Sequence, residues 1–206
     1  MTLTVKTTIR WMERMNEIIS EQKEYLTNLD QAIGDGDHGI NMARGFQEVV
    51  KKLRTTNYKT VADVLRDVAM TIMSKVGGAS GPLYGTAFLK MSLALKGKDE
   101  ISFQEFSSAV IEALNGLIQR GKANPGDKTM VDVWNPVVEY IKERDQVDWD
   151  GLVATAREAM EKTKDLKALK GRAAYLKERS IGHIDPGATS SYYLFLSLAD
   201  VMKEGE

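Results

Sequence analysis

Cysteine is absent from this chain of 206 residues, which also contains four prolines and two histidines. Without cysteine there is no disulfide framework, no thiolate metal site and no cysteine nucleophile. An excess of one charge is also missing, because 28 Lys and Arg face 29 Asp and Glu, for a formal net charge of -1. This balance argues against a direct nucleic-acid binder, which normally needs a basic surface.

Long hydrophobic runs are missing as well. No apolar stretch approaches the roughly 20 residues that span a bilayer, and the first residues lack the uninterrupted apolar core of a signal peptide. The chain is nevertheless 43% hydrophobic and long enough for one substantial core. We therefore expect a soluble, cytoplasmic protein with no membrane contact, folded as a single domain over residues 1–206.

Apolar residues recur at three- and four-residue spacing along almost the whole chain, which is typical of amphipathic helices. Capping-box patterns begin two of these stretches, Thr60 with Asp63 and Ser102 with Glu105. Pro136 interrupts another and is expected to kink it. Sustained two-residue alternation is absent from the sequence, so the prediction is an all-α fold of about eight helices. Their apolar stripes cover residues 5–29, 42–53, 61–72, 83–95, 102–117, 130–141, 152–160 and 192–199.

The connections between these helices are of two kinds. Three are polar turns (TTNYK, KGKDEI and RDQV), whereas four are rich in Gly, Pro and Asp (IGDGDHG, VGGASGPLYG, GKANPGDK and GHIDPGAT). Short connections favour antiparallel neighbours, so the four glycine-bearing connections should share one end of the bundle, the rim. Four helix amino termini would then meet there, and their free N–H groups and dipoles favour an anion.

The rim also carries an acidic cluster. In LDQAIGDGDHGINMARGF, three carboxylates, Asp30, Asp35 and Asp37, fall within eight residues. Helix capping would explain one aspartate. Three carboxylates beside an anion site favour bridging metal ions, because Mg²⁺ typically shares protein carboxylates with substrate phosphates. A calcium-binding EF-hand is excluded, since Gly39 stands where that loop needs a ligand.

Single residues of the other rim segments carry weaker signals. Ser80 could donate its hydroxyl to a phosphate, although such glycine-rich loops are often plain turns. His38 could donate to a phosphate, accept a phosphoryl group or cap the second helix, and its position favours contact or capping over covalent chemistry. His183 lies in another rim connection, where a structural hydrogen bond in a turn is the alternative to a functional role. Arg172 could neutralise phosphate charge or lie solvated on the surface. It belongs to a basic segment, residues 165–187, which could move as a lid or form a partly helical surface connection. Met130 could line an adenine face or fill the core.

Four stretches together resemble a known family: DQAIGDGDHGINMARGF, GGASGPLYG, GDKTMVDVWNP and GRAAYLKERSIGHIDPGATSSYYL. In this order and spacing they look like the nucleotide-binding L subunit of dihydroxyacetone kinase, the DhaL type. The resemblance implies an eight-helix antiparallel up-and-down barrel with the nucleotide at one rim. It implies that Asp30, Asp35 and Asp37 hold two Mg²⁺ ions and that Arg172 is catalytic. The residues it places around ADP are His38, Gly39, Ile40, Asn41, Ala79, Ser80, Gly121, Met130, Arg172, Asp185, Pro186 and Gly187.

The resemblance also implies partners, because 206 residues leave no room for a substrate domain. ADP would then be a bound cofactor that cycles to ATP, recharged by the phosphohistidine-carrying M subunit of the phosphoenolpyruvate:sugar phosphotransferase system. A separate K subunit would hold dihydroxyacetone, so phosphotransfer would require both partners. Two alternatives stay open: a nucleotide sensor that acts on a transcriptional regulator, and a metal-dependent phosphohydrolase, for which no base is recognisable.

Overall fold

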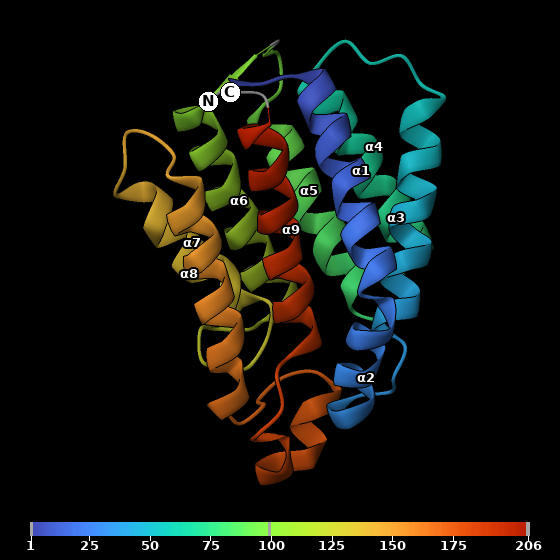
Figure 1. Cartoon of the computed structure of the whole chain (residues 1–206), viewed down its shortest axis with the longest axis vertical. Helices are drawn as coiled ribbons and strands as arrows, with labels where there is room; N and C mark the ends of the chain where they lie inside the picture. The colour runs from blue at the N-terminus through green and yellow to red at the C-terminus, as the bar shows by residue number, and fades with distance from the viewer. Residues whose placement is uncertain (1, 99, 205–206) are drawn as a thin grey trace.

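The computed structural model describes residues 2–98 and 100–204, and these form an all-α barrel (Figure 1). The elements in chain order are β1 (Thr2–Leu3), α1 (Val5–Glu21), α2 (Lys23–Ile33), α3 (His38–Arg54), α4 (Val61–Lys75), α5 (Ser80–Ala94), β2 (Ile101–Ser102), α6 (Phe103–Gly121), α7 (Val131–Lys142), α8 (Trp149–Lys162), two 3-10 segments η1 (Thr163–Asp165) and η2 (Arg172–Ser180), and α9 (Pro186–Lys203).

Eight of the helices close a ring. Contacts join α1 to α3, each of α3 to α9 to the next in chain order, and α9 back to α1. The predicted eight-helix antiparallel barrel is therefore confirmed, and α2 is an additional helix that packs on α3 and α9 at one end (Figure 1). Both chain termini lie at the opposite end of the barrel.

The first predicted helix, residues 5–29, is wrong in its bounds. The chain breaks at Gln22, which closes α1 through its N–H to the Ile18 carbonyl and begins α2 at once. The break lets α2 lie across the start of α3. Gly39 makes this approach possible, because a Cβ atom there would stand 2.1 Å from the Lys23 carbonyl oxygen.

At the end opposite the rim, the sequence signals for helix starts are confirmed. Thr60 accepts a hydrogen bond from the N–H of Asp63, and Ser102 forms a full capping box with Glu105. A two-stranded antiparallel sheet, which the sequence pattern did not predict, pairs Thr2 and Leu3 of β1 with Ser102 and Ile101 of β2. Each strand is two residues long, too short to show an alternation.

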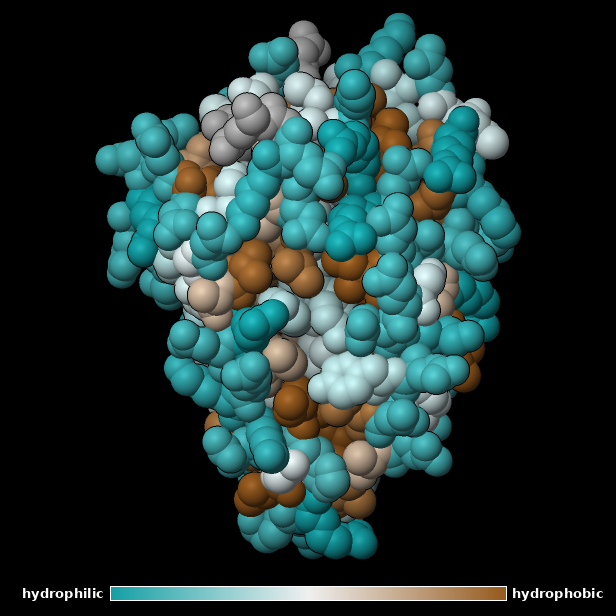
Figure 2. Space-filling view, viewed as in Figure 1, coloured by the Kyte–Doolittle hydropathy of each residue, from teal (hydrophilic) through white to brown (hydrophobic). Residues whose placement is uncertain are grey.

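The barrel is filled by large apolar side chains. Trp134 meets Phe195 edge to face at 5.0 Å, and Trp11 meets Phe88 at 6.0 Å. Figure 2 shows a mainly hydrophilic face in which hydrophobic residues occur in small groups rather than as a continuous band. Among the described residues, no helix is both long enough and apolar enough to cross a membrane.

Candidate nucleotide and metal site

The four glycine-bearing connections meet as predicted, around one cavity of about 450 Å³. This volume lies in the range of small-ligand sites. Residues 170–173 of the basic segment close one side of it. Of the candidate residues named from the sequence, Gly39, Ile40 and His183 do not line the cavity; those that do are Asp30, Asp35, Asp37, His38, Asn41, Ala79, Ser80, Gly121, Met130, Arg172, Asp185, Pro186 and Gly187.

Three helices point amino termini at this cavity without a cap from their own N-cap side chains. The N-cap residues are Asp37 for α3, Ala79 for α5 and Met130 for α7, and in the described structure none of these three side chains accepts a cap hydrogen bond. Helix α9 differs, because Asp185 accepts from the N–H of Ala188 at 2.7 Å. The cavity therefore faces helix ends that suit an anionic ligand.

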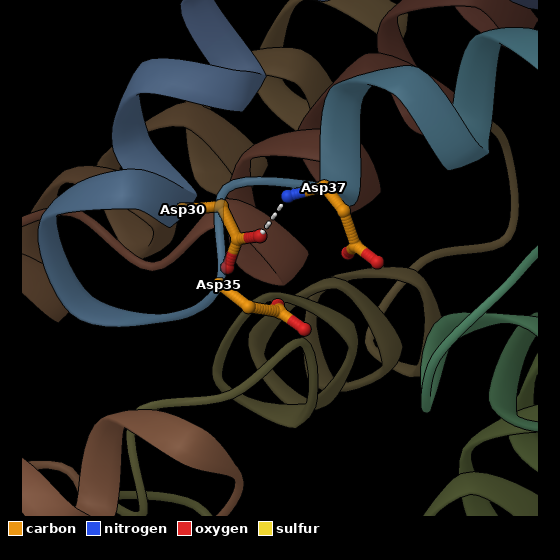
Figure 3. A group of neighbouring side chains, drawn as sticks. All are labelled: Asp30, Asp35 and Asp37. Atoms are coloured by element: carbon orange, nitrogen blue, oxygen red, sulfur yellow. Dashed lines mark hydrogen bonds between the residues drawn. The ribbon is translucent and has the colours of Figure 1, made fainter.

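The acidic cluster lies at the edge of the same cavity (Figure 3). Asp30 comes from the last turn of α2, and Asp35 and Asp37 come from the connection to α3. One carboxylate oxygen of each lies within 4.8 Å of the others. Like charges this close repel unless a cation neutralises them, and hard oxygen ligands suit Mg²⁺.

Capping explains only part of this cluster. The Asp30 carboxylate accepts hydrogen bonds from the N–H groups of Asp37 at 2.9 Å and His38 at 3.0 Å, and so caps α3 from outside the helix. Asp35 is held by Arg172 at 2.9 Å. The residues therefore fit a metal: two backbone N–H groups fix Asp30, and Asp35 and Asp37 extend the cluster along the cavity that they line.

Arg172 begins η2 and reaches back over the cavity to Asp35. Its side chain is 71% exposed, so the ion pair adds little to stability. The basic segment is thus partly helical, one of the two predicted alternatives, and it covers the rim. A guanidinium at this edge can turn from the carboxylate to a phosphate oxygen.

His38 is buried at the base of the cavity. Its Nδ1 atom lies 3.1 Å from the Ser80 hydroxyl, and its Nε2 atom lies 3.0 Å from the Ser190 hydroxyl. Burial lowers the pKa of His38 to about 4, against the attraction of Asp30 and Asp37. The ring is therefore neutral near pH 7 and positions Ser80.

Gly39 and Ile40 follow in the first turn of α3 but do not line the cavity. Gly39 is packed against α2, and Ile40 is 52% exposed. Their predicted place around ADP stays a prediction. Asn41 does line the cavity: it accepts from Arg44 at 2.7 Å, and a Cβ atom on Gly77 would stand 2.9 Å from its amide, so it supports the 77–79 turn.

Asp185 and Met130 form the opposite wall. Burial raises the pKa of Asp185 to about 7. Met130 is 4% exposed and stands beside Gly187, where a Cβ atom would lie 3.8 Å from it. The adenine contact suggested for Met130 stays a prediction, since core packing explains its burial equally well.

Lys128 is a residue whose role the sequence reasoning missed, although its GDKTM motif was noted. It is 1% exposed, has a left-handed φ of 62° and lines the cavity. Its ammonium donates to the carbonyls of Thr163 at 2.7 Å, Leu166 at 3.1 Å and His183 at 2.5 Å. It thereby ties together the two ends of the basic segment. Sequence spacing could not predict this role, because the three acceptors are backbone carbonyls of segments far from Lys128 in the sequence, and every residue type carries such a carbonyl.

Comparisons with known proteins agree with this geometry. The family model described as the DAK2 domain matches residues 32–200. The ADP-binding subunit DhaL of PEP-dependent dihydroxyacetone kinase 1 from Listeria innocua is 50% identical over 187 residues, 91% of each chain. The corresponding DhaL subunit from Escherichia coli is 43% identical over 210 residues, 99% of this chain and all of that one. The chain therefore belongs to the DAK2-domain family and, within it, to the DhaL group.

Solved structures show the same fold. The native dihydroxyacetone kinase of C. freundii superposes with a TM-score of 0.76 at 22% identity, over 94% of this chain and 34% of that one. Its complex with AMP-PNP and Mg²⁺ gives a TM-score of 0.73. The chain spans about a third of the length of that kinase.

Proposed function

We propose that this protein is the ADP-binding phosphotransfer subunit of a phosphoenolpyruvate-dependent dihydroxyacetone kinase. The observation that carries the proposal is the meeting, in one cavity, of a three-carboxylate cluster with helix amino termini that lack a cap from their own N-cap side chains. Helix amino termini favour phosphates, and carboxylates favour Mg²⁺. A cavity that has both therefore fits a metal-bound diphosphate better than it fits a phosphate or a metal ion alone. Relatives that bear the name ADP-binding subunit support the nucleotide's identity.

Within this proposal, Asp30, Asp35 and Asp37 hold two Mg²⁺ ions, and the amino termini of α3 and α5 bind the phosphates. A bound nucleotide would supply the atom that accepts and gives up the phosphoryl group, and Mg²⁺ held by the three aspartates would neutralise phosphate charge. Arg172 leaves Asp35 to stabilise negative charge that develops during transfer. The basic segment limits access of water, and Lys128 holds it in place.

The remaining parts of the proposal are the partners and the location. The phosphoryl donor is the phosphohistidine of an M subunit, and the acceptor is dihydroxyacetone on a K subunit, both in the cytoplasm. The open face of the cavity, beside Arg172 and the acidic cluster, is where each partner has to approach.

The proposal is tested by the nucleotide content of the protein as purified. Protein isolated without added nucleotide is denatured with acid, and the released nucleotide is identified and compared with the protein concentration. Stoichiometric ADP is the expected result. Absence of nucleotide, together with weak ADP binding in Mg²⁺, would contradict the proposed role.

A further inference from the structure

A chain of buried hydrogen bonds runs from the cavity into the barrel core. It begins at the Ser80 hydroxyl, passes through the two ring nitrogens of His38 and reaches Ser190. The Tyr84 hydroxyl continues it, at 2.7 Å from the Ser190 hydroxyl and 3.0 Å from that of Ser191. Trp134 ends it, with Nε1 at 3.1 Å from the Ser191 hydroxyl. Ser190, Ser191 and Tyr84 are fully buried, so water cannot reorder these three groups.

At the deep end of this network, the Trp134 indole N–H only donates, so the Ser191 oxygen accepts from it. The arrangement that uses every hydroxyl proton has Ser191 donate to Tyr84 and Tyr84 donate to Ser190.

The direction at His38 depends on the single proton of Ser190. One arrangement sends it to the Gly187 carbonyl, which lies 3.1 Å away and only accepts. The other sends it to His38 Nε2 and leaves two oxygen lone pairs facing each other at Gly187. The Gly187 carbonyl therefore favours the first arrangement, in which His38 Nε2 carries the proton and donates to the Ser190 oxygen.

We infer that Ser190 is a positioning residue that holds His38 as the Nε2–H tautomer, so that the Ser80 hydroxyl donates to Nδ1 and offers the cavity only an acceptor oxygen. Nδ1 carries no proton in this tautomer and has to accept. The Ser80 proton is then directed away from the cavity. This reverses the expectation that Ser80 donates to a phosphate.

The inference defines which ligand groups Ser80 can contact. Phosphate oxygens of a diphosphate only accept, so the Ser80 oxygen would instead face a cation or a ligand N–H or O–H group. Phosphate contact at the start of α5 would come from backbone N–H groups, which Ala79 leaves without a side-chain cap. This ligand consequence rests on the proposed function, whereas the tautomer does not.

The tautomer is measured by NMR on nucleotide-free protein labelled with ¹⁵N-histidine. The chain has two histidines, and His183→Gln removes the exposed one, so the remaining signals belong to His38. The expected spectrum has a protonated Nε2 and an unprotonated Nδ1. A ring protonated at Nδ1, or at both nitrogens at pH 7, would overturn the inference without any variant at Ser190.

The role of Ser190 is measured with Ser190→Ala and a matched control. Ser197 is also fully buried on α9, but its hydroxyl donates to the Leu194 carbonyl and not to the chain of bonds. Ser190→Ala should populate the Nδ1–H form, whereas Ser197→Ala should leave the spectrum unchanged. An unchanged His38 spectrum in folded Ser190→Ala would remove Ser190 from the positioning role.

A binding measurement tests the consequence for the ligand. Ser80→Ala should change the dissociation constant for ADP in saturating Mg²⁺ by less than about threefold, because no phosphate hydrogen bond is lost. Loss of a hydroxyl donor to a charged phosphate would instead weaken binding by about 10- to 100-fold, which would contradict the inference. If the wild type itself failed to bind ADP, the proposed function would fail while the ring measurement still tested the tautomer.

Discussion

The two ends of the barrel begin their helices differently. At the end opposite the rim, α4, α6 and α8 are each capped by their own N-cap side chains, Thr60, Ser102 and Asp148. At the rim, the N-cap residues of α3, α5 and α7 make no such bond in the described structure. Asp30 caps α3 from outside the helix, and the Val131 N–H of α7 donates to the Thr129 hydroxyl. A missing cap costs about 1 kcal/mol, so the rim forgoes stability mainly at α5, whose helix end can bind a ligand.

Backbone conformation follows the same division. Within the described residues, every position with positive φ except Gly97 belongs to the rim connections or the basic segment. The non-glycine cases are Lys122, Lys128 and Lys177. Left-handed backbone is unfavourable for residues with a side chain and concentrates at functional sites. Chain order thus separates a stabilising end of the barrel from a binding end, and variants placed at each end can test this separation.

The largest effect is expected from Asp35→Asn at the rim. It should weaken ADP binding in Mg²⁺ by about 100-fold or more, because the diphosphate is tied to the protein through the carboxylate-bound metal. Calorimetric titration checks this. Chelator should also lower the melting temperature of the wild type, but not that of the variant.

The matched control is Asp148→Asn, the N-cap of α8 at the opposite end. Asparagine caps as well as aspartate, so both stability and ADP affinity should stay near the wild-type values. Equal losses of ADP affinity in the two variants would remove the functional distinction between the ends.

Lys128→Met should lower the free energy of unfolding by about 3 kcal/mol, since it leaves three carbonyls without their donor. It should also speed ADP release, because the two ends of the basic segment lose the hydrogen bonds that Lys128 donates to them. Urea unfolding and stopped-flow release measure the two effects. Lys142→Met, which breaks an exposed pair with Glu139, should cost about 0.5 kcal/mol or less and leave release unchanged.

Arg172→Ala should change stability by less than about 0.5 kcal/mol, because the ion pair with Asp35 is exposed. Phosphoryl transfer in a reconstituted system should fall about 10- to 100-fold, with a smaller change in ADP retention. The control is Arg54→Ala at the other end, an arginine that is 68% exposed and paired with Glu13. If both variants transfer at the wild-type rate, Arg172 is a surface residue without a catalytic role.

The smallest effect is the pH dependence of the ligand-free protein between about pH 4 and 6.5. His38, with its pKa lowered to about 4, takes up its proton mainly in the unfolded state, so its contribution to stability falls as the pH falls. Asp185, with its pKa raised to about 7, contributes the opposite slope. The two should largely cancel. Asp185→Asn should therefore steepen the loss of stability toward acid, as urea unfolding at several pH values can show.

Sequence reasoning predicted those features that local patterns encode. Apolar spacing predicted an all-α fold of about eight helices, the family resemblance implied that they close into a barrel, and glycine-rich connections predicted which helix starts meet. The break at Gln22 was missed because neither glycine nor proline marks it, and its cause is the packing of α2 on α3. Lys128 and Ser190 were missed because their partners come from other elements, which only the closed barrel brings within hydrogen-bond distance.

Whether the rim holds ADP as a resident cofactor is measured by the retention of radiolabelled ADP. The protein is loaded with radiolabelled ADP and run through many turnovers with its K and M partners, phosphoenolpyruvate and excess unlabelled nucleotide. Because the carboxylates, helix ends and basic segment would have to release the diphosphate together, dissociation should be slow and the label should stay on the protein. Loss of the label within a few turnovers, or efficient turnover on ATP alone, would contradict the cofactor role.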